Sequence, residues 1–263
     1  MPPARGRLGR GPLPSRMQHA ACGGWQPDPV RFLSRLLLSP LARLVFRPRV
    51  IGRRNVPRRG GVLLASNHLA FIDSIVLTLV ARRSVSFMAK SSYFTGRGIR
   101  GRLQRSFFSG VGAVPVERGA GSAAQDALDA GLRVLEAGEA FSIYPEGTRS
   151  RDGRLYRGRT GVAWLALTAG VPVVPVGLIG TDDMQPGGKG PIRFARVTVK
   201  FGEPLDLSSY GPASSGRARR EATDAVMNAI QQLTGQERAG SYNEPPPATI
   251  RERVGRMLHP ERR

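Results

Sequence analysis

The sequence contains little cysteine and few aromatic residues, and each scarcity argues against a class of protein. Its 263 residues include one cysteine, Cys22, which rules out an internal disulfide framework and a metal site built from several cysteines. Aromatic residues make up 6% of the chain and do not alternate regularly with basic ones, which argues against stacking on single-stranded nucleic acid. No His, Cys and Asp residues cluster at the spacing of metal ligands, so no metal is predicted.

Acidic residues are also scarce, at 19 against 40 Lys and Arg, which gives a formal charge of +21. Such a charge draws a protein to polyanions, either nucleic acid or an anionic membrane surface. No apolar run precedes a small-residue cleavage site, so a secretory signal is not expected. With one cysteine, this composition predicts a reducing, cytoplasm-facing location.

Composition divides the chain into four predicted regions. These are a basic tail without fixed structure over 1–27, an amphipathic region over 28–50, a folded domain over 51–235 and a basic, Pro-containing tail over 236–263. Within the domain, strands alternate with helices, which predicts an α/β fold whose largely parallel or mixed central sheet is flanked by helices. We expect residues 171–176 to form an edge strand, or one ended by its prolines.

Two basic segments suit a membrane surface. On a helical wheel, Val30–Arg47 places arginines on one half and leucines on the other, although Pro40 divides it. The segment is too charged to span a bilayer and suits its interface; the alternative is an ordinary surface helix. A second basic helix is expected from Gly96. Its G-x-G-x-x-G pattern is not a dinucleotide site, because five residues separate it from the preceding strand and no acidic residue follows on the next strand.

His68 and Asp73 are the central candidates for catalysis. His68 follows a predicted buried strand over 61–65, and Asp73 lies near the start of a predicted helix. At this spacing a carboxylate can bind one ring nitrogen and leave the other as a base. A structural histidine explains the pair as well, but His19 and His259 lie in the predicted tails, so His68 is the one histidine available for chemistry.

Further polar residues follow other predicted strands, whose carboxyl ends meet at one edge in such sheets. Taken singly, they are explained as surface turns or solvated strand ends. Their convergence favours a phosphate site, because Arg and Lys bind phosphate and Gly147 allows backbone N–H groups close to an oxyanion. These residues are Lys90, Glu117, Arg118, Glu146, Gly147, Thr148 and Arg149. Because no Ser–His or Cys–His pattern is present, a direct mechanism is predicted, in which His68 deprotonates a substrate hydroxyl that attacks an acyl carbonyl.

Four sequence blocks, at 67–73, 112–118, 141–150 and 171–175, resemble the ordered motifs of the glycerolipid acyltransferases. Within that family the chain is most similar to bacterial 1-acylglycerol-3-phosphate acyltransferases. The first block reads Asn-His-x-x-x-x-Asp, and the third reads Phe-Ser-Ile-Tyr-Pro-Glu-Gly-Thr-Arg-Ser. Glu117 stands where many members have Asp.

The resemblance implies roles for individual residues. His68 and Asp73 match the catalytic pair, and Pro175 matches the region linked to the acyl donor. Positions linked to the acceptor phosphate are Lys90, Arg118, Glu146, Gly147, Thr148 and Arg149. The resemblance further implies acyl-CoA or acyl carrier protein as donor, a lysophospholipid acceptor, phosphatidic acid as product and no cofactor. It places the protein on an anionic membrane, at the cytoplasmic face, as a peripheral or monotopic protein.

Three alternatives stay open at this point. The same chemistry could act on another lysolipid or lipid alcohol, which the motifs do not distinguish. A nucleic-acid-binding protein would account for the charge but leaves His68 and Asp73 unexplained. A membrane scaffold with an inactive site is disfavoured by the complete His–Asp pair.

Overall fold

The computed structural model describes residues 48–116, 123–186 and 193–244. The predicted helix Val30–Arg47, the outermost tails and Arg118 lie outside these residues. The strands are β1 (Arg49–Ile51), β2 (Val62–Ser66), β3 (Val85–Lys90), β4 (Ala113–Val116), β5 (Ala140–Ile143), β6 (Leu155–Arg157), β7 (Val173–Ile179), β8 (Thr198–Phe201) and β9 (Arg238–Tyr242). The helices are η1 (Arg53–Asn55), α2 (Asp73–Val80), η2 (Ser91–Tyr93), α3 (Gly98–Gly110), α4 (Ala123–Glu136), α5 (Gly161–Ala169), α6 (Thr181–Met184), η4 (Ser208–Tyr210) and α7 (Gly216–Thr234).

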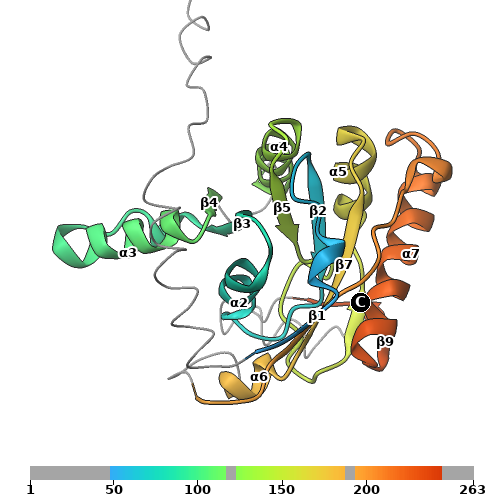
Figure 1. Cartoon of the computed structure of the whole chain (residues 1–263). Coiled ribbons are helices and arrows are strands. Elements are labelled where there is room, and N and C mark those ends of the chain that lie inside the picture. Colours follow the sequence, from blue (N-terminus) through green and yellow to red (C-terminus); the bar gives the residue numbers. More distant parts are fainter. Residues whose placement is uncertain (1–47, 117–122, 187–192, 245–263) are drawn as a thin grey trace, which may run out of the picture.

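The main sheet of the described chain has seven strands in the order β1-β8-β7-β2-β5-β3-β4 (Figure 1). The five strands from β7 to β4 run parallel to one another, whereas β8 is antiparallel to β7 and β1 pairs in parallel with β8. The predicted α/β fold with a largely parallel or mixed sheet is therefore confirmed. All five parallel strands end at the same edge, which is where such folds place their ligands.

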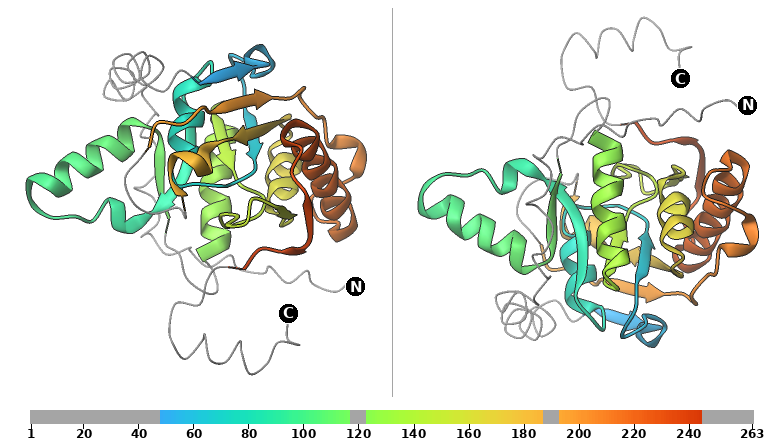
Figure 2. Two further views of the ribbon diagram at one scale, coloured as in Figure 1. Left: turned by 90° about the horizontal axis from the view of Figure 1, so that it is seen from below. Right: turned by 90° about the horizontal axis from the view of Figure 1, so that it is seen from above.

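Helices cover both faces of the sheet (Figures 1 and 2). Central strand β2 is buried along its whole length, and its alternate side chains enter two different clusters. Val62 and Leu64 pack in a cluster that includes side chains of α2 and α6. Leu63 and Ala65 pack in a cluster with α4, α5 and α7. Burial on both faces explains the continuous apolar run before His68 and fixes the end of β2 firmly.

Strand β7 corrects one prediction. We expected residues 171–176 at an edge because of their prolines, but β7 lies inside the sheet between β8 and β2. Backbone N–H groups of alternate residues point to the same neighbouring strand, and that of Val173 donates to Leu205 on the β8 side. The nitrogen of Pro175 faces this same side, where β8 has already ended at Phe201. Proline is tolerated here because no ladder hydrogen bond is required of it.

The boundaries of the folded part differ from those expected at both ends. The folded domain was predicted to begin at residue 51, but edge strand β1 (Arg49–Ile51) begins two residues earlier. Residues from 236 onward were predicted to be a loose tail, but Arg238–Tyr242 form β9, which pairs in parallel with β6. Neither short strand has the apolar alternation that identifies strands in a sequence, because most of their side chains are partly or fully exposed.

Candidate active site

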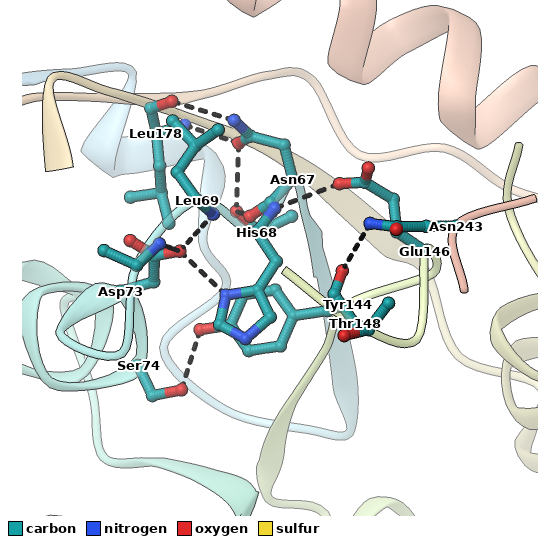
Figure 3. Close-up of polar contacts among 12 residues, drawn as sticks. Asn67, His68, Leu69, Asp73, Ser74, Tyr144, Glu146, Thr148, Leu178 and Asn243 are labelled. Carbon is teal, nitrogen blue, oxygen red and sulfur yellow. Dashed lines mark hydrogen bonds and ion pairs between the residues drawn. The ribbon is translucent and has the colours of Figure 1, made fainter. Parts of the chain in front are cut away.

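His68 lies two residues beyond the end of β2, and Asp73 is the first residue of α2 (Figure 3). Asp73 Oδ2 accepts a hydrogen bond from His68 Nδ1 at 2.8 Å. The same oxygen accepts the backbone N–H groups of Leu69 at 2.7 Å and Ala70 at 2.9 Å. The carboxylate is fully buried, so the turn between strand and helix holds it rigidly against the ring. The predicted contact of imidazole and carboxylate is confirmed.

This contact determines which ring nitrogen can act as a base. An ionised carboxylate can only accept hydrogen bonds, so the proton of neutral His68 is on Nδ1 and the lone pair is on Nε2. The side chain is 14% exposed, and among the described residues no hydrogen bond occupies Nε2. No Ser, Thr or Cys of the described chain donates to that nitrogen, so no enzyme nucleophile is paired with it. The arrangement suits proton abstraction from a bound hydroxyl.

Tyr144, which follows β5, restrains the imidazole from one side and was missed by the sequence analysis. Its ring stacks on that of His68 with centroids 3.9 Å apart and planes at 11° (Figure 3). Its hydroxyl is 2.7 Å from Ser74 Oγ in the first turn of α2. Burial, reinforced by the charge of Asp73, holds the pKa of Tyr144 well above its usual value. The phenol therefore stays neutral and fixes the plane of the imidazole without adding charge.

Glu146 holds the backbone of His68 in place through a hydrogen bond. Its Oε1 accepts the His68 N–H at 3.1 Å, and its Oε2 accepts the Tyr156 N–H at 3.0 Å. The Ser150 N–H donates to the His68 carbonyl at 2.7 Å, so the loop after β5 holds His68 on both sides. Because the Glu146 side chain is 0% exposed, this corrects the expectation that it binds the acceptor phosphate. We assign it a positioning role.

Burial raises the pKa of Glu146 to about 7, against the hydrogen bonds from the two backbone N–H groups, which lower it. A carboxyl with a raised folded-state pKa binds more protons folded than unfolded, so it makes stability fall as pH rises from about 5 to about 7.

We expect the free energy of unfolding of the wild type, relative to Glu146→Gln, to fall by about 2 kcal/mol between about pH 5 and about pH 8. Urea titrations at several pH values measure this difference. Glu221→Gln, at an exposed position of α7, serves as the control. Its free energy of unfolding should change with pH as that of the wild type does. If the free energy of unfolding changes with pH in the same way for wild type and Glu146→Gln, then Glu146 stays ionised throughout this range.

The next residues of the loop form a tight turn. Gly147 has φ of 77°, and its N–H donates to the Tyr144 carbonyl at 3.0 Å. A Cβ there would lie 3.0 Å from Arg159 Nε, so both the backbone angle and the neighbour favour glycine. The Gly147 N–H is therefore engaged within the turn, and the expectation that this glycine brings backbone N–H groups close to an oxyanion stays a prediction. The carbonyl oxygen of Thr148 accepts a hydrogen bond from Asn243 Nδ2 at 3.3 Å, and the next residue, Arg149, is half-buried.

The remaining predicted site residues lie at different depths. Lys90 is the exposed last residue of β3 and pairs in the sheet with Val116, the last residue of β4. Arg118 comes two residues after Val116, outside the described chain. Pro175 pairs with Ala65 inside the sheet, short of the strand edge. The parallel topology therefore brings Lys90 and the 146–149 loop to the edge that holds His68, whereas Pro175 lies deeper.

Asn67 ties this edge to the C-terminal segment. Its side-chain amide exchanges two hydrogen bonds with the backbone of Leu178, at 2.8 and 2.9 Å (Figure 3). Its Nδ2 also donates to Gln236 Oε1 at 2.9 Å, and Gln236 Nε2 donates to the Gly153 carbonyl at 2.6 Å. Gln236, which we expected to begin a loose tail, thus contacts the residue before His68. No local pattern in the sequence indicates a partner 169 residues away.

We expect Gln236→Leu to lower the free energy of unfolding by about 1–3 kcal/mol, because one N–H of the buried Asn67 amide loses its acceptor. The strand end before His68 is then less well fixed, so kcat should fall several-fold while KM changes less. Thermal unfolding and steady-state kinetics measure the two effects. Gln232→Leu, exposed on α7, is the matched control. A variant indistinguishable from Gln232→Leu would show that the contact has no positioning role.

Two kinds of feature are absent from residues 48–116, 123–186 and 193–244. None of the helices there combines the length and the apolar character needed to cross a bilayer. No group of three or more His, Cys, Asp or Glu side chains in these residues is arranged to hold a metal ion.

Comparison with known proteins agrees with this geometry. The family model named Acyltransferase matches residues 47–179, which include β2, the His68–Asp73 pair and the loop that supports it. The chain belongs to this acyltransferase family. The matched residues contain all the contacts made by His68 and Asp73 in the described chain, so the site coincides with the family's domain.

Individual relatives carry a more specific name. A chloroplast 1-acyl-sn-glycerol-3-phosphate acyltransferase of Brassica napus is 30% identical over 176 residues, which are 66% of this chain and 49% of that protein. The 1-acyl-sn-glycerol-3-phosphate acyltransferase of Bacillus subtilis is 26% identical over 70% of this chain and 87% of its own. This chain therefore spans about half the length of the plant relative. The crystal structure of the Thermotoga maritima 1-acyl-sn-glycerophosphate acyltransferase shares the fold, with a TM-score of 0.59, 24% identity, and coverage of 80% and 83% of the two chains.

Proposed function

We propose that the protein is an O-acyltransferase that transfers a fatty acyl group to the free hydroxyl of 1-acylglycerol-3-phosphate and forms phosphatidic acid. The observation that carries the proposal is the 2.8 Å contact of His68 Nδ1 with Asp73, which leaves Nε2 as a base at the ligand edge of an acyltransferase-family domain. The names of these relatives support this choice of acceptor, since they are called 1-acyl-sn-glycerol-3-phosphate acyltransferases.

The proposed reaction needs no covalent intermediate on the enzyme. His68 Nε2 takes the proton of the acceptor hydroxyl as its oxygen attacks the carbonyl carbon of the acyl thioester. Asp73 stabilises the imidazolium that forms and keeps its orientation. The tetrahedral intermediate then expels the thiolate, which takes the proton from Nε2 as the new ester forms. The enzyme ends in its starting protonation state, and the products are the ester and a free thiol.

The acceptor phosphate is proposed to bind the basic residues of the same edge. Lys90 ends β3, and Arg149 lies in the loop that holds His68, so both lie at the same edge of the sheet as the base. Arg118, two residues past the end of β4, is proposed as a third member. Arginine offers a planar fork of donors that matches phosphate, and lysine adds a mobile charge. Glu146 supports this loop from within rather than contacting the ligand.

The donor is proposed to be acyl-CoA or acyl carrier protein, with no cofactor, and Pro175 stays a candidate for shaping the donor region. We further propose a peripheral or monotopic association with the cytoplasmic face of an anionic membrane. The formal charge of +21 supports this, because a basic protein is attracted to anionic lipid. A lysophospholipid acceptor would be met at that surface.

A panel of acceptors tests the substrate. The protein is given one long-chain acyl-CoA and vesicles that carry 1-acylglycerol-3-phosphate, a lysophosphatidylcholine or a monoacylglycerol. We expect the phosphate monoester to be acylated with the highest kcat/KM. A preference for another lysolipid, or for the neutral monoacylglycerol, would contradict the proposed acceptor and favour the same chemistry on a different lipid alcohol.

A further inference from the structure

Helix α3 projects from the body of the domain, as Figures 1 and 2 show. Its C-terminal end is anchored by Phe108, which is 6% exposed and stacks on Tyr93 with ring centroids 4.6 Å apart. In the first turn of the helix, Gly101 packs so closely on Gly96 that a Cβ there would lie 2.1 Å from backbone atoms. These contacts fix which side of α3 faces the preceding segment.

The opposite side of α3 carries a stripe of exposed apolar side chains. Ile99 is 76% exposed, Leu103 67% and Phe107 40%. On most protein surfaces, exposed apolar residues occur singly and not in such a group. The three are spaced four residues apart, and each residue of an α-helix turns by about 100°, so they form one continuous stripe. Gly101 and Phe108 fall on the other side of the same helix, which is why the stripe faces outward.

Arginines border this stripe. Arg100 and Arg102 fall on either side of it at about 100° per residue, whereas Arg105 lies on the other side of the helix and donates to the Gly96 carbonyl. Residues 91–110 contain no Asp or Glu. An apolar stripe between cationic side chains matches the boundary between lipid headgroups and acyl chains, where Arg reaches phosphate while its stem stays beside apolar groups.

We propose that α3 docks on an anionic lipid bilayer, with Ile99, Leu103 and Phe107 entering the acyl boundary and Arg100 and Arg102 binding lipid phosphates. Charge and hydrophobicity favour a bilayer over two other partners, a second copy of the protein and nucleic acid. A second copy of α3 would set arginines against arginines, and nucleic acid offers the aliphatic side chains nothing comparable to bury against. An anionic bilayer satisfies both kinds of side chain at once.

The docking helix is connected to the site. Phe71, three residues after His68, has its ring 5.9 Å from that of Tyr93 and 6.3 Å from that of Phe108. The C-terminal end of α3 therefore packs beside the loop that carries the base, and a bilayer bound to the opposite side of the helix would lie about one helix width from that loop. The inference rests on the proposed function in one respect: docking of α3 would bring the enzyme to the membrane from which it takes its lipid acceptor. Vesicle binding needs no turnover, however, so the two can fail separately.

Co-sedimentation of the full chain with phosphatidylglycerol–phosphatidylcholine vesicles tests the proposal. Because each basic residue near an anionic surface adds about 1 kcal/mol, Arg100→Gln with Arg102→Gln should weaken partitioning roughly thirtyfold. Ile99→Ser with Leu103→Ser should weaken it about tenfold or more. Helix α7 lies on the opposite side of the domain from α3 (Figure 1). Arg217→Gln in α7 and Tyr210→Ser in η4, which contacts α7, are the matched controls and should bind as wild type. Thermal unfolding checks that each variant is folded.

A depth measurement distinguishes lipid from other occupants. A fluorophore on Leu103→Cys in a Cys22→Ser chain should be quenched by brominated acyl chains, and one on Tyr210→Cys should not. Unchanged vesicle binding of both α3 double variants, or an unquenched label at position 103, would overturn the proposal. So would a change of oligomeric state in the α3 variants without a change in vesicle binding, which would identify a second copy as the occupant.

Discussion

Replacing His68 by alanine is expected to lower kcat/KM for acyl transfer by about 10²–10⁴-fold, the range for loss of a positioned general base. The variant should remain folded, because the side chain is part of no hydrophobic cluster and Asp73 keeps two backbone N–H donors, those of Leu69 and Ala70. Vesicle binding should be unchanged, since His68 is not on α3. The measurement is the initial rate of phosphatidic acid formation, with circular dichroism as the check of folding.

The control for this variant is His259→Ala, which removes a histidine of the C-terminal region predicted to be a tail. It should retain the wild-type rate. If the His68→Ala protein is folded and transfers acyl groups as fast as His259→Ala, then His68 is not the base and the mechanism fails.

Asp73→Asn is expected to have an effect of similar size, about 10³-fold or more on kcat, as for the orienting aspartate of a Ser-His-Asp triad changed to an amide. The amide oxygen can still accept the three donors that Oδ2 now serves, but the negative charge that stabilises the imidazolium is lost. In the flipped orientation, the NH₂ group faces those donors instead. If that NH₂ faces His68, Nδ1 must become the acceptor. The proton then moves to Nε2, and the base is lost.

Nitrogen NMR of the His68 ring reads this change directly, because the two neutral tautomers differ in which nitrogen is protonated. Loss of an acceptor for a buried N–H also lowers the free energy of unfolding, by about 1–3 kcal/mol, so kinetics are measured well below the melting temperature. Asp126→Asn, in the exposed first turn of α4, is the matched control. A folded Asp73→Asn protein with its proton still on Nδ1 and a wild-type rate would contradict the orienting role.

The central unit of the fold could be predicted because its signals are local. Residues 61–65 are apolar on both faces, and a buried parallel strand requires this, so the strand before His68 was found. Asp73 and the apolar run to Val80 likewise defined α2. The pairing of His68 with Asp73 spans five residues and follows from the geometry of one turn.

The predictions that failed depend on contacts between distant segments. Pro175 indicated an edge strand, yet β8 stops where its missing N–H would be needed, and no local pattern gives the length of a neighbouring strand. Gln236 follows a helix-ending glycine and resembles a tail, although it reaches Asn67. Glu146 was assigned to the acceptor phosphate because it lies in the third sequence block, directly after a predicted strand. Here two backbone N–H groups, one of them that of His68 itself, make its burial possible.

The most direct test of the account follows a radiolabelled acyl group from donor to product. Wild-type protein is mixed with labelled acyl-CoA, or labelled acyl carrier protein, and 1-acylglycerol-3-phosphate in anionic vesicles. Lipid, protein and free thiol are then separated over the first turnovers. We expect label in phosphatidic acid, one thiol released for each ester formed and none bound to protein, because the acceptor hydroxyl activated by His68 attacks the thioester itself. Label that first accumulates on the protein, or no phosphatidic acid from either donor, would contradict the account.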